Sequence, residues 1–456
     1  MTDIKKIVAE QHDLFATGKT LAHPFRMEQL KKLKTMLKEN EEALYQALRK
    51  DLNKSRQESL TTEIGFLYAE IDMAAKNLRN WMKSEKVSTP ITHKGTANYI
   101  VKEPYGVTLV ISPWNYPLQL AIAPVIGAIA AGNTTVLKPS EYSPATSACL
   151  AEIISEAFDP AFFCAVLGEK ETSEALLKEK FDYIFFTGSS TVGKAVMRAA
   201  SEHLTPVTLE LGGKSPAIID KDAKIDVTAK RLVWGKFTNA GQTCVAPDYL
   251  FIHEKVKNKL LRSMKKQMRA LYGKNPLENK NYTRIVNQKH FQRLQHFMDD
   301  GNILLGGAID EEKRKIEPTV IDQIDWDSPI MQEEIFGPLL PVITFHKLSE
   351  VIEILKTKGK PLALYYFGED EQSQQQVIEN VSFGGGCIND TLYHLANPYL
   401  PFGGVGESGM GAYHGKYSFE TFSHSKSIMK QTTKFDVGLR YPNSKIGKRL
   451  IQKLFH

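Results

Sequence analysis

Two residues of this sequence have side chains suited to covalent catalysis. Cys244 ends a short run of small and polar residues that starts at Asn239, and Glu210 ends an apolar run just before two glycines. A thiol can attack a carbonyl carbon, and a carboxylate can act as the base that later activates water. The pair therefore indicates an enzyme that forms a covalent intermediate and then hydrolyses it.

Cys244 differs from the other cysteines in its neighbours. Cys149 lies in an apolar helical run and Cys164 in a strand-like segment, which is the pattern of small buried hydrophobic residues. Cys387 follows three glycines, and its sequence neighbours favour neither a buried nor a reactive role. Polar neighbours favour reactivity at Cys244, although a structural cysteine also fits the local pattern. The wide spacing of all four fits neither a C-x-x-C metal site nor a disulfide framework. We therefore expect no metal site and a reducing, cytoplasmic compartment.

A third candidate is Asn115, which lies between Pro113 and Pro117 after a β-branched run. A side-chain amide held by two prolines is a preorganised donor that suits an oxyanion. A structural turn explains the same residues, because proline and asparagine are common in turns.

Two further segments follow strand-like runs and could bind a nucleotide. Gly188 and Gly193 would let the backbone approach a phosphate at the start of a helix, but an ordinary strand-to-helix turn fits equally. The spacing nearly matches a P-loop, yet Ala195 stands where serine or threonine would hold Mg²⁺, which counts against a nucleoside triphosphatase. Lys138 and Glu141 could hold ribose hydroxyls, although these two residues alone favour a solvated loop.

The composition is that of an ordinary globular enzyme. The chain has 456 residues, 42% of them hydrophobic, and 58 basic against 52 acidic residues give a net charge of +6. This charge is too weak to indicate nucleic-acid binding. The longest apolar stretch, residues 118–132, is interrupted by Gln119 and Pro124 and is too short to span a bilayer. The N-terminus lacks the apolar core and cleavage site of a signal peptide.

Hydrophobic periodicity predicts the elements that must position these residues. The first ~80 residues have helical spacing, and residues 87–103 have the alternation of a short β-hairpin. From residue 107 onward, strand and helix patterns alternate through 134–137, 183–186, 207–209 and 217–219, and a second α/β region runs from about 250 to 411. The alternation predicts an α/β fold with parallel sheets, in which ligands bind beyond the carboxyl ends of the strands.

Taken together, these motifs resemble the aldehyde dehydrogenase superfamily from end to end. The chain looks most like the class 3 branch, which includes fatty aldehyde dehydrogenases. The matching motifs, in order, are Pro-Trp-Asn at 113–115, Lys-Pro-Ser-Glu at 138–141, Phe-Thr-Gly-Ser at 186–189, Glu-Leu-Gly-Gly-Lys at 210–214, Gly-Gln-Thr-Cys at 241–244, Glu-Glu-Ile-Phe-Gly-Pro at 333–338 and Pro-Phe-Gly-Gly-Val-Gly at 401–406.

The resemblance implies a role for each catalytic candidate. Cys244 would attack the aldehyde carbonyl, and the Asn115 amide with the Cys244 backbone N–H would form the oxyanion hole. Hydride would then pass to the nicotinamide, and Glu210 would activate the water that hydrolyses the resulting thioester. The implied cofactor is NAD, with NADP also accepted, and the implied substrates are medium- or long-chain aliphatic and aromatic aldehydes.

The resemblance also implies the cofactor-binding residues. Lys138 and Glu141 would contact the adenosine ribose, Gly188, Ser189 and Val192 would lie near the pyrophosphate, and Glu334 would hold the nicotinamide ribose with Phe336 beside it. The full implied set is Trp114, Lys138, Glu141, Gly188, Ser189, Val192, Gly193, Leu211, Gly212, Glu334 and Phe336.

The implied organisation is a Rossmann-type NAD-binding domain, an α/β catalytic domain and a small β element that oligomerises the chain. These would comprise residues 1–83 with 104–211, residues 212–412, and residues 84–103 with 413–430. A homodimer is the expected assembly. Residues 431–456 form a basic C-terminal tail whose apolar residues recur at helical spacing, so membrane contact would be at most peripheral. A tail that packs on the protein or frays is the favoured interpretation.

Several other functions fit parts of the pattern. A CoA-acylating aldehyde dehydrogenase would share the fold and the thiol, but such enzymes usually lack the glutamate base, so Glu210 favours hydrolysis. A cysteine hydrolase would need a histidine partner for Cys244. A non-catalytic role would leave the combination of Asn115, Glu210 and Cys244 unexplained.

Overall fold

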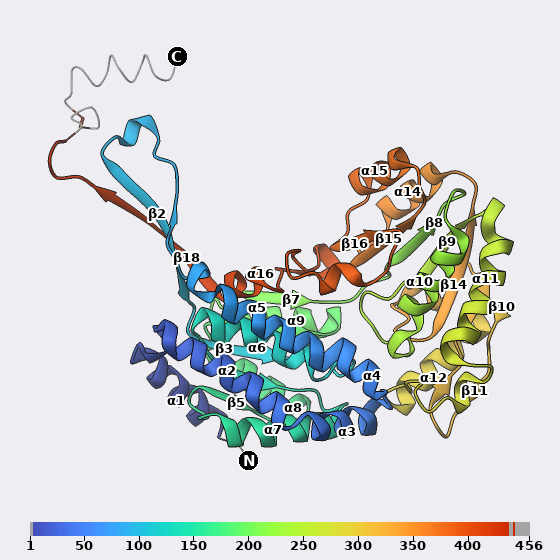
Figure 1. Ribbon diagram of the computed structural model, residues 1–456, viewed down its shortest axis with the longest axis horizontal. Helices are drawn as coiled ribbons and strands as arrows, with labels where there is room; N and C mark the ends of the chain where they lie inside the picture. The colour runs from blue at the N-terminus through green and yellow to red at the C-terminus, as the bar shows by residue number, and fades with distance from the viewer. Residues whose placement is uncertain (1–2, 437–440, 443–456) are drawn as a thin grey trace. The chain divides into compact units, whose positions relative to one another are not determined.

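The computed structural model describes residues 3–436 and 441–442 (Figure 1). Within these residues the chain forms two compact units. The larger unit contains residues 3–81 and 104–423, and the smaller contains residues 82–103 and the described residues from 424 onward. The apolar tail residues singled out in the sequence, from 446 onward, lie outside the described residues.

The larger unit begins with helices, as the sequence predicts. Leu30, Leu33 and Leu37 recur at helical spacing and are fully buried, so this face of the second helix packs inward. A π-helical turn, Leu60–Ile64, joins the fourth and fifth helices. The helices are α1 (Ile4–Ala16), α2 (His23–Glu39), α3 (Glu41–Leu52), α4 (Arg56–Ser59) and α5 (Gly65–Trp81).

The first sheet of the larger unit has the strand order β17-β7-β6-β3-β4-β5. All its adjacent pairs are parallel except β17 with β7, so the sequence prediction of a parallel sheet is confirmed. The central strands are buried along their whole length, which explains their nearly continuous apolar sequences. The strands are β3 (Val107–Ile111), β4 (Thr134–Lys138), β5 (Phe163–Ala165), β6 (Tyr183–Thr187), β7 (Val207–Glu210) and β17 (Gly409–Met410).

Crossover helices connect these parallel strands. The apolar stretch between β3 and β4 forms a helix with every residue buried, even though it contains Pro124. These helices are α6 (Gln119–Ala131), α7 (Pro144–Ala157), α8 (Lys170–Lys178) and α9 (Ser190–Ser201).

The second sheet has the strand order β10-β13-β14-β9-β8-β15-β16. Residues 217–219, predicted to continue the first alternation, belong here instead, because β8 pairs with β9 and β15. The second region therefore starts near residue 216 and not near 250. The chain leaves the first sheet through Gly212 and Gly213, and the positive φ of 153° at Gly213 suits glycine. The strands are β8 (Pro216–Ile219), β9 (Tyr249–His253), β10 (Asn302–Leu305), β13 (Thr319–Asp322), β14 (Leu339–Phe345), β15 (Ala363–Phe367) and β16 (Gly385–Ile388).

Helices and a small ribbon complete the larger unit. The ribbon pairs β11 (Ile309–Asp310) with β12 (Lys315–Ile316). The helices are α10 (Ile225–Phe237), α11 (Glu254–Tyr272), α12 (Gln288–Phe297), α13 (Pro329–Gln332), α14 (Leu348–Thr357), α15 (Glu371–Asn380) and α16 (Lys416–Thr421). No helix among the described residues combines the length and the hydropathy that crossing a bilayer requires.

The smaller unit contains a three-stranded sheet of order β1-β2-β18, with β1 (Glu85–Lys86), β2 (Thr96–Pro104) and β18 (Ser423–Gln431). The predicted hairpin over residues 87–103 is partly wrong. Its first arm is only two residues long and precedes Val87. Pro90 lacks an N–H donor and Gly95 has a φ of 92°, so the intervening segment forms a loop with a 3₁₀ turn at Ile91–His93.

Candidate active site

The carboxyl edge of the first sheet brings together several residues that the sequence singled out. In register, Lys138 lies opposite Ile111, and Glu210 lies opposite Thr187 on the neighbouring strand. The loops that carry Trp114 and Gly188 leave from this same edge, because parallel strands end on one side of a sheet.

Glu210 is the last residue of β7, and its side chain is only 2% exposed. Its backbone is fixed because its carbonyl accepts the N–H of Gly188 at 3.0 Å and because it pairs with Gly409 across the antiparallel edge. Neither carboxylate oxygen has a hydrogen-bond partner in the protein. Burial raises the pKa of Glu210 well above its ordinary value of 4.5. The side chain is therefore an unsatisfied base, and such groups cluster at functional sites.

A strained turn after α10 places Cys244. Asn239, Ala240 and Gly241 have successive φ values of 53°, 51° and 73°, in the left-handed region. Only glycine fits at position 241, because a Cβ there would lie 2.2 Å from the carbonyl oxygen of Gly337. Two consecutive non-glycine residues in this region indicate strain that the surrounding contacts maintain.

The Cys244 thiol is half-buried, and its pKa is raised. Burial is the main cause, and the carboxylates of Glu334 and Glu210 add to it. The backbone N–H groups of Cys244 and Val245 oppose the shift by favouring the thiolate. The electrostatic influence of both carboxylates on this thiol indicates that the three predicted side chains share one site.

Asn115 is held in the same cluster. Its side-chain amide donates to the carbonyl of Gln242 at 3.1 Å, two residues before the thiol, and only 2% of the residue is exposed. An amide nitrogen has two hydrogens, so this bond leaves a second donor for a substrate oxygen.

The support behind Asn115 was not predicted from the sequence. Lys54 donates to the Asn115 carbonyl at 3.0 Å and to Glu63 at 2.5 Å, with both charged side chains fully buried. Glu63 in turn accepts the backbone N–H groups of Leu118 and Gln119 at 2.9 and 3.1 Å. The buried pair therefore fixes the loop that carries Asn115 and the start of α6. Nothing in the local sequence marks these two residues.

A cavity of about 190 Å³ ends at Cys244. Its walls are mainly apolar and aromatic, and they include Tyr116 and Trp234. The π-helical turn contributes Thr61 and Thr62. The remaining aromatic walls are Phe66, Tyr393, Phe402 and Tyr413.

The histidines near the site do not partner Cys244. His394 lies 3.5 Å from the sulfur of Cys387, and His414 contacts the carbonyl of Leu395 at 2.8 Å. Burial lowers the pKa of each to about 4, so both imidazoles are neutral near pH 7. A cysteine hydrolase based on either histidine is therefore not supported.

Of the two residues predicted to bind the adenosine ribose, Lys138 is buried, whereas Glu141 lies in an exposed turn. Lys138 is only 2% exposed, and its ammonium lies 2.8 Å from a Glu141 carboxylate oxygen. The expectation of a solvated loop was wrong for Lys138, because it is the last residue of a fully buried strand. The pair presents a cation and a carboxylate at the sheet edge, which suits hydroxyl groups.

The predicted pyrophosphate turn is the N-terminus of α9. Ser189 caps this helix by accepting the backbone N–H of Val192 at 3.4 Å. The two glycines also have packing roles, since a Cβ at Gly188 would lie 2.6 Å from Phe186 and one at Gly193 would lie 2.7 Å from Leu211. Glycine at both positions permits this close packing of the turn, and the first N–H groups of a helix suit a phosphate.

Glu334 and its neighbours fit the nicotinamide end of a dinucleotide. A Cβ at Gly212 would lie 1.9 Å from a Glu334 carboxylate oxygen, so the absent side chain provides the space that this carboxylate fills. Burial, with the nearby charge of Asp248, raises the pKa of Glu334 to about 8. Phe336 has a φ of 50° and packs edge-on against Trp114, with 5.3 Å between ring centroids. These contacts bring four of the predicted cofactor residues into one cluster.

Lys236 is a further charged group that the sequence analysis missed. It is fully buried on α10, and its ammonium has no hydrogen-bond partner. Burial lowers its pKa to about 8, although Asp248 and Glu334 oppose the shift. The available signal was a lysine inside the apolar run that ends α10.

Replacement of Gly212 by alanine is expected to weaken NAD binding by about 10-fold to 100-fold. The added methyl group must displace the Glu334 carboxylate, and overpacking of this kind costs about 1–3 kcal/mol. Fluorescence titration with NAD would measure the dissociation constant. Gly359→Ala is a matched control, because a Cβ there meets its nearest atom at an ordinary 3.6 Å. An unchanged constant for Gly212→Ala would refute the role given to this contact.

Comparison with known proteins agrees with this geometry. The model of the aldehyde dehydrogenase family matches residues 1–428, and the chain therefore belongs to the aldehyde dehydrogenase family. The protein is an NAD(P)-dependent aldehyde dehydrogenase that oxidises aldehyde substrates. The relatives give no support to a CoA-acylating activity.

The individual relatives place the chain in the class 3 branch, as predicted. It is 49% identical to the 4,4'-diaponeurosporen-aldehyde dehydrogenase of Staphylococcus aureus over the full length of both chains. It is 45% identical to mouse aldehyde dehydrogenase family 3 member B1, covering 97% of this chain and 95% of that one. It is 44% identical to the mouse dimeric NADP-preferring aldehyde dehydrogenase, covering 97% and 98%.

A solved structure shows the same fold. The substrate-bound state of Staphylococcus aureus AldH superimposes with a TM-score of 0.97 at 49% identity, covering 100% of each chain. The prediction of an aldehyde dehydrogenase fold is thereby confirmed.

Proposed function

We propose that this enzyme oxidises medium- and long-chain aliphatic or aromatic aldehydes to carboxylic acids by covalent catalysis at Cys244. The support is the mainly apolar and aromatic cavity that ends at this thiol. Apolar walls favour the hydrocarbon part of a substrate and leave its carbonyl at the reactive sulfur. The name of the Staphylococcus aureus relative, a diaponeurosporen-aldehyde dehydrogenase, also points to an apolar aldehyde.

In this mechanism the Cys244 sulfur bonds to the carbonyl carbon, and the second amide hydrogen of Asn115 and the Cys244 backbone N–H stabilise the oxygen. The bound nicotinamide supplies the hydride acceptor and, in its oxidised form, a positive charge. Because the pKa of Cys244 is raised, a positive charge in the site would favour the reactive thiolate. The residue that would hold the cofactor ribose nearest the thiol is Glu334, with Phe336 and Trp114 beside it.

The single observation that carries hydrolysis is the unpartnered carboxylate of Glu210. It is buried beside Cys244, and no hydrogen bond to the protein occupies its oxygens. A carboxylate with raised pKa can remove a proton from water, and the resulting hydroxide attacks the thioester carbon and releases the acid and the thiol. A CoA-acylating enzyme would not use this base.

We assign cofactor binding to residues 1–83 with 104–211 and catalysis to residues 212–412, because β7 and β8, on either side of this boundary, belong to different sheets. We assign oligomerisation to residues 84–103 with 413–430. A homodimer agrees with the name of the mouse relative, a dimeric NADP-preferring aldehyde dehydrogenase. Residues 413–423 belong to the larger unit. Within the proposed oligomerisation element, β2 and β18 would therefore supply the sheet part of the interface.

The compartment and cofactor preference follow from a few side chains. The free thiols of all four cysteines agree with a reducing, cytoplasmic compartment. Glu141 favours the free ribose hydroxyls of NAD, because its carboxylate would repel a ribose phosphate, while Lys138 beside it leaves NADP acceptable. Any membrane contact would be peripheral.

The test is absorbance at the reduced-nicotinamide band with hexanal and NAD in the absence of CoA. A steady increase in absorbance is expected. An enzyme that stays silent until CoA is added would contradict the hydrolytic mechanism, and activity with NADP alone would contradict the preference for NAD.

A further inference from the structure

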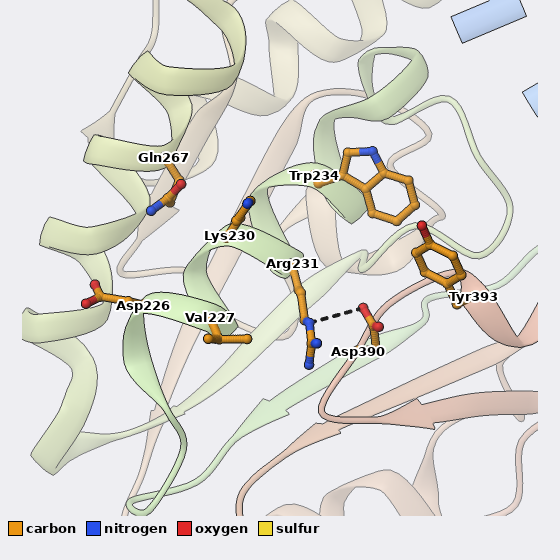
Figure 2. A pocket seen from close by; sticks show the side chains of 8 residues that line it. All are labelled: Asp226, Val227, Lys230, Arg231, Trp234, Gln267, Asp390 and Tyr393. Carbon is orange, nitrogen blue, oxygen red and sulfur yellow. Dashed lines mark ion pairs between the residues drawn. The ribbon is translucent and has the colours of Figure 1, made fainter. Parts of the chain in front are cut away.

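A second hollow, of about 710 Å³, lies beside the thiol cavity (Figure 2). One wall is formed by α10, which contributes Val227, Arg231 and Trp234. The facing wall is the segment after β16, which contributes Asp390 and Tyr393. The thiol mechanism uses none of the charged groups here, so this hollow has no role in the site already described.

Two aromatic side chains line both spaces. Trp234 and Tyr393 belong to the wall of the hollow and to the wall of the cavity that ends at Cys244. Their ring centroids are 5.5 Å apart with an angle of 33° between the ring planes, so the two rings are in contact, and Figure 2 shows them next to each other. The two spaces are therefore adjacent, with this aromatic pair between them.

One side of α10 runs along both spaces. Val227, Arg231 and Trp234 follow at intervals of four and three residues, which places them on one face of the helix. Thr238, four residues after Trp234, continues this stripe and lines the thiol cavity. The stripe therefore extends from the wall of the hollow to the wall of the cavity that contains Cys244.

Strained backbone maintains the facing wall. Asn389 and Leu392 have φ values of 59° and 62°, although neither is glycine. The Arg231 guanidinium donates to the Asn389 carbonyl, and the Thr391 hydroxyl donates to the Arg231 carbonyl at 2.9 Å. Strain of this kind persists where surrounding contacts hold it, and it clusters at ligand-binding sites.

The floor of the hollow is apolar and exposed to solvent. Tyr393 is 63% exposed and Val227 is 49% exposed. The charged groups lie around this floor, and the Arg231–Asp390 pair is loose at 3.7 Å with both side chains partly exposed. Covering such a floor with hydrocarbon is favourable by about 25 cal/mol per Å², while the charges can stay in water.

From this arrangement we propose that the hollow is an outer compartment of the aldehyde channel and binds the distal hydrocarbon of long-chain aldehydes. The proposal rests on the proposed function of the Cys244 cavity. Short aldehydes occupy the inner cavity alone, whereas a longer chain extends past the Trp234–Tyr393 pair and lies on Val227. The aromatic pair and Val227 therefore determine the preference for chain length.

The test is a series of saturated aldehydes from butanal to hexadecanal, with kcat/KM measured for wild type and for Val227→Trp. The larger side chain fills the outer floor from an exposed helix position, so the fold should be retained. The ratio of kcat/KM for hexadecanal to that for hexanal is expected to fall by about tenfold or more, as losses of hydrocarbon contact typically do. Ile378→Trp, at an exposed position of similar accessibility on α15, is the matched control.

A second variant tests the aromatic pair. Tyr393→Ala removes one side of the constriction, and it should change the ratio between long and short aldehydes while Cys244 remains reactive toward a thiol reagent. An unchanged ratio in Val227→Trp, or an equal loss at every chain length, would overturn the proposal. Failure of the wild type to oxidise any aldehyde in the series would instead refute the proposed function of the inner cavity.

Discussion

Replacement of Cys244 by alanine is expected to lower the rate of NAD reduction by at least about 10⁴-fold. Among the described residues that line the apolar cavity, Cys244 carries the only thiol, and a thiolate is the strongest nucleophile among those side chains. In other covalent enzymes, loss of the nucleophile costs up to about 10⁶-fold in kcat. The measurement is steady-state absorbance with saturating hexanal and NAD.

The control for this variant is Cys149→Ala. Cys149 lies on α7, and burial raises the pKa of its thiol, so we expect its loss to leave the rate within a few fold of wild type. Both variants should bind NAD with unchanged affinity, since neither thiol is among the predicted cofactor contacts. Retention of substantial dehydrogenase activity by Cys244→Ala would refute covalent catalysis at this residue.

Replacement of Glu210 by glutamine should separate the two halves of the reaction. Rapid mixing should still give a first turnover of NADH, because thiol addition and hydride transfer do not require this base. The later turnovers should be about 10²–10⁴-fold slower, which is the typical contribution of a general base. Stopped-flow absorbance would resolve the burst from the steady state. A steady-state rate equal to that of wild type would contradict the role of Glu210 in deacylation.

The raised pKa of Glu210 also fixes the direction of two pH effects. The base acts when ionised, so kcat of wild type should increase with pH through this raised pKa, and the Glu210→Gln profile should lack that increase. For stability, the folded state favours the protonated carboxyl. Its stabilising contribution is present below the pKa of the unfolded chain and is lost as pH rises through the folded pKa. Glu210→Gln should therefore gain free energy of unfolding relative to wild type at alkaline pH but not at acid pH.

The fold was largely predictable because local patterns carry it. The buried strands that include Val107 and Tyr183 are nearly continuous apolar runs, and the crossover helices lie between them. The assignment of residues 217–219 to the first sheet failed because strand pairing is a long-range property. β8 pairs with β15, which is more than 140 residues later, and no local pattern records this partner.

The residues of the site also divide into those that local sequence marks and those that only the folded chain brings together. Cys244, Glu210 and Asn115 could be identified because their motifs are short and contiguous. Lys54 could not, since its importance comes from a buried carboxylate and a backbone carbonyl that only the folded chain brings to it. The burial of Lys138 was also not predicted, because a lysine at the end of a strand has the local pattern of a surface loop. Burial of charged groups depends on what packs over them, and the sequence does not state that locally.

The π-helical turn at Leu60–Ile64 has a consequence for how this enzyme can vary. A π turn contains one residue more than the regular helix around it, and each residue of an α-helix advances the chain by about 100°. Because a π turn absorbs its additional residue locally, deletion of a single residue between Glu58 and Gly65 would replace the turn by regular helix. The positions of Glu63 against Lys54 and of the threonines in the cavity wall would then change. Variants of this protein must therefore keep the length of this segment as well as the carboxylate of Glu63.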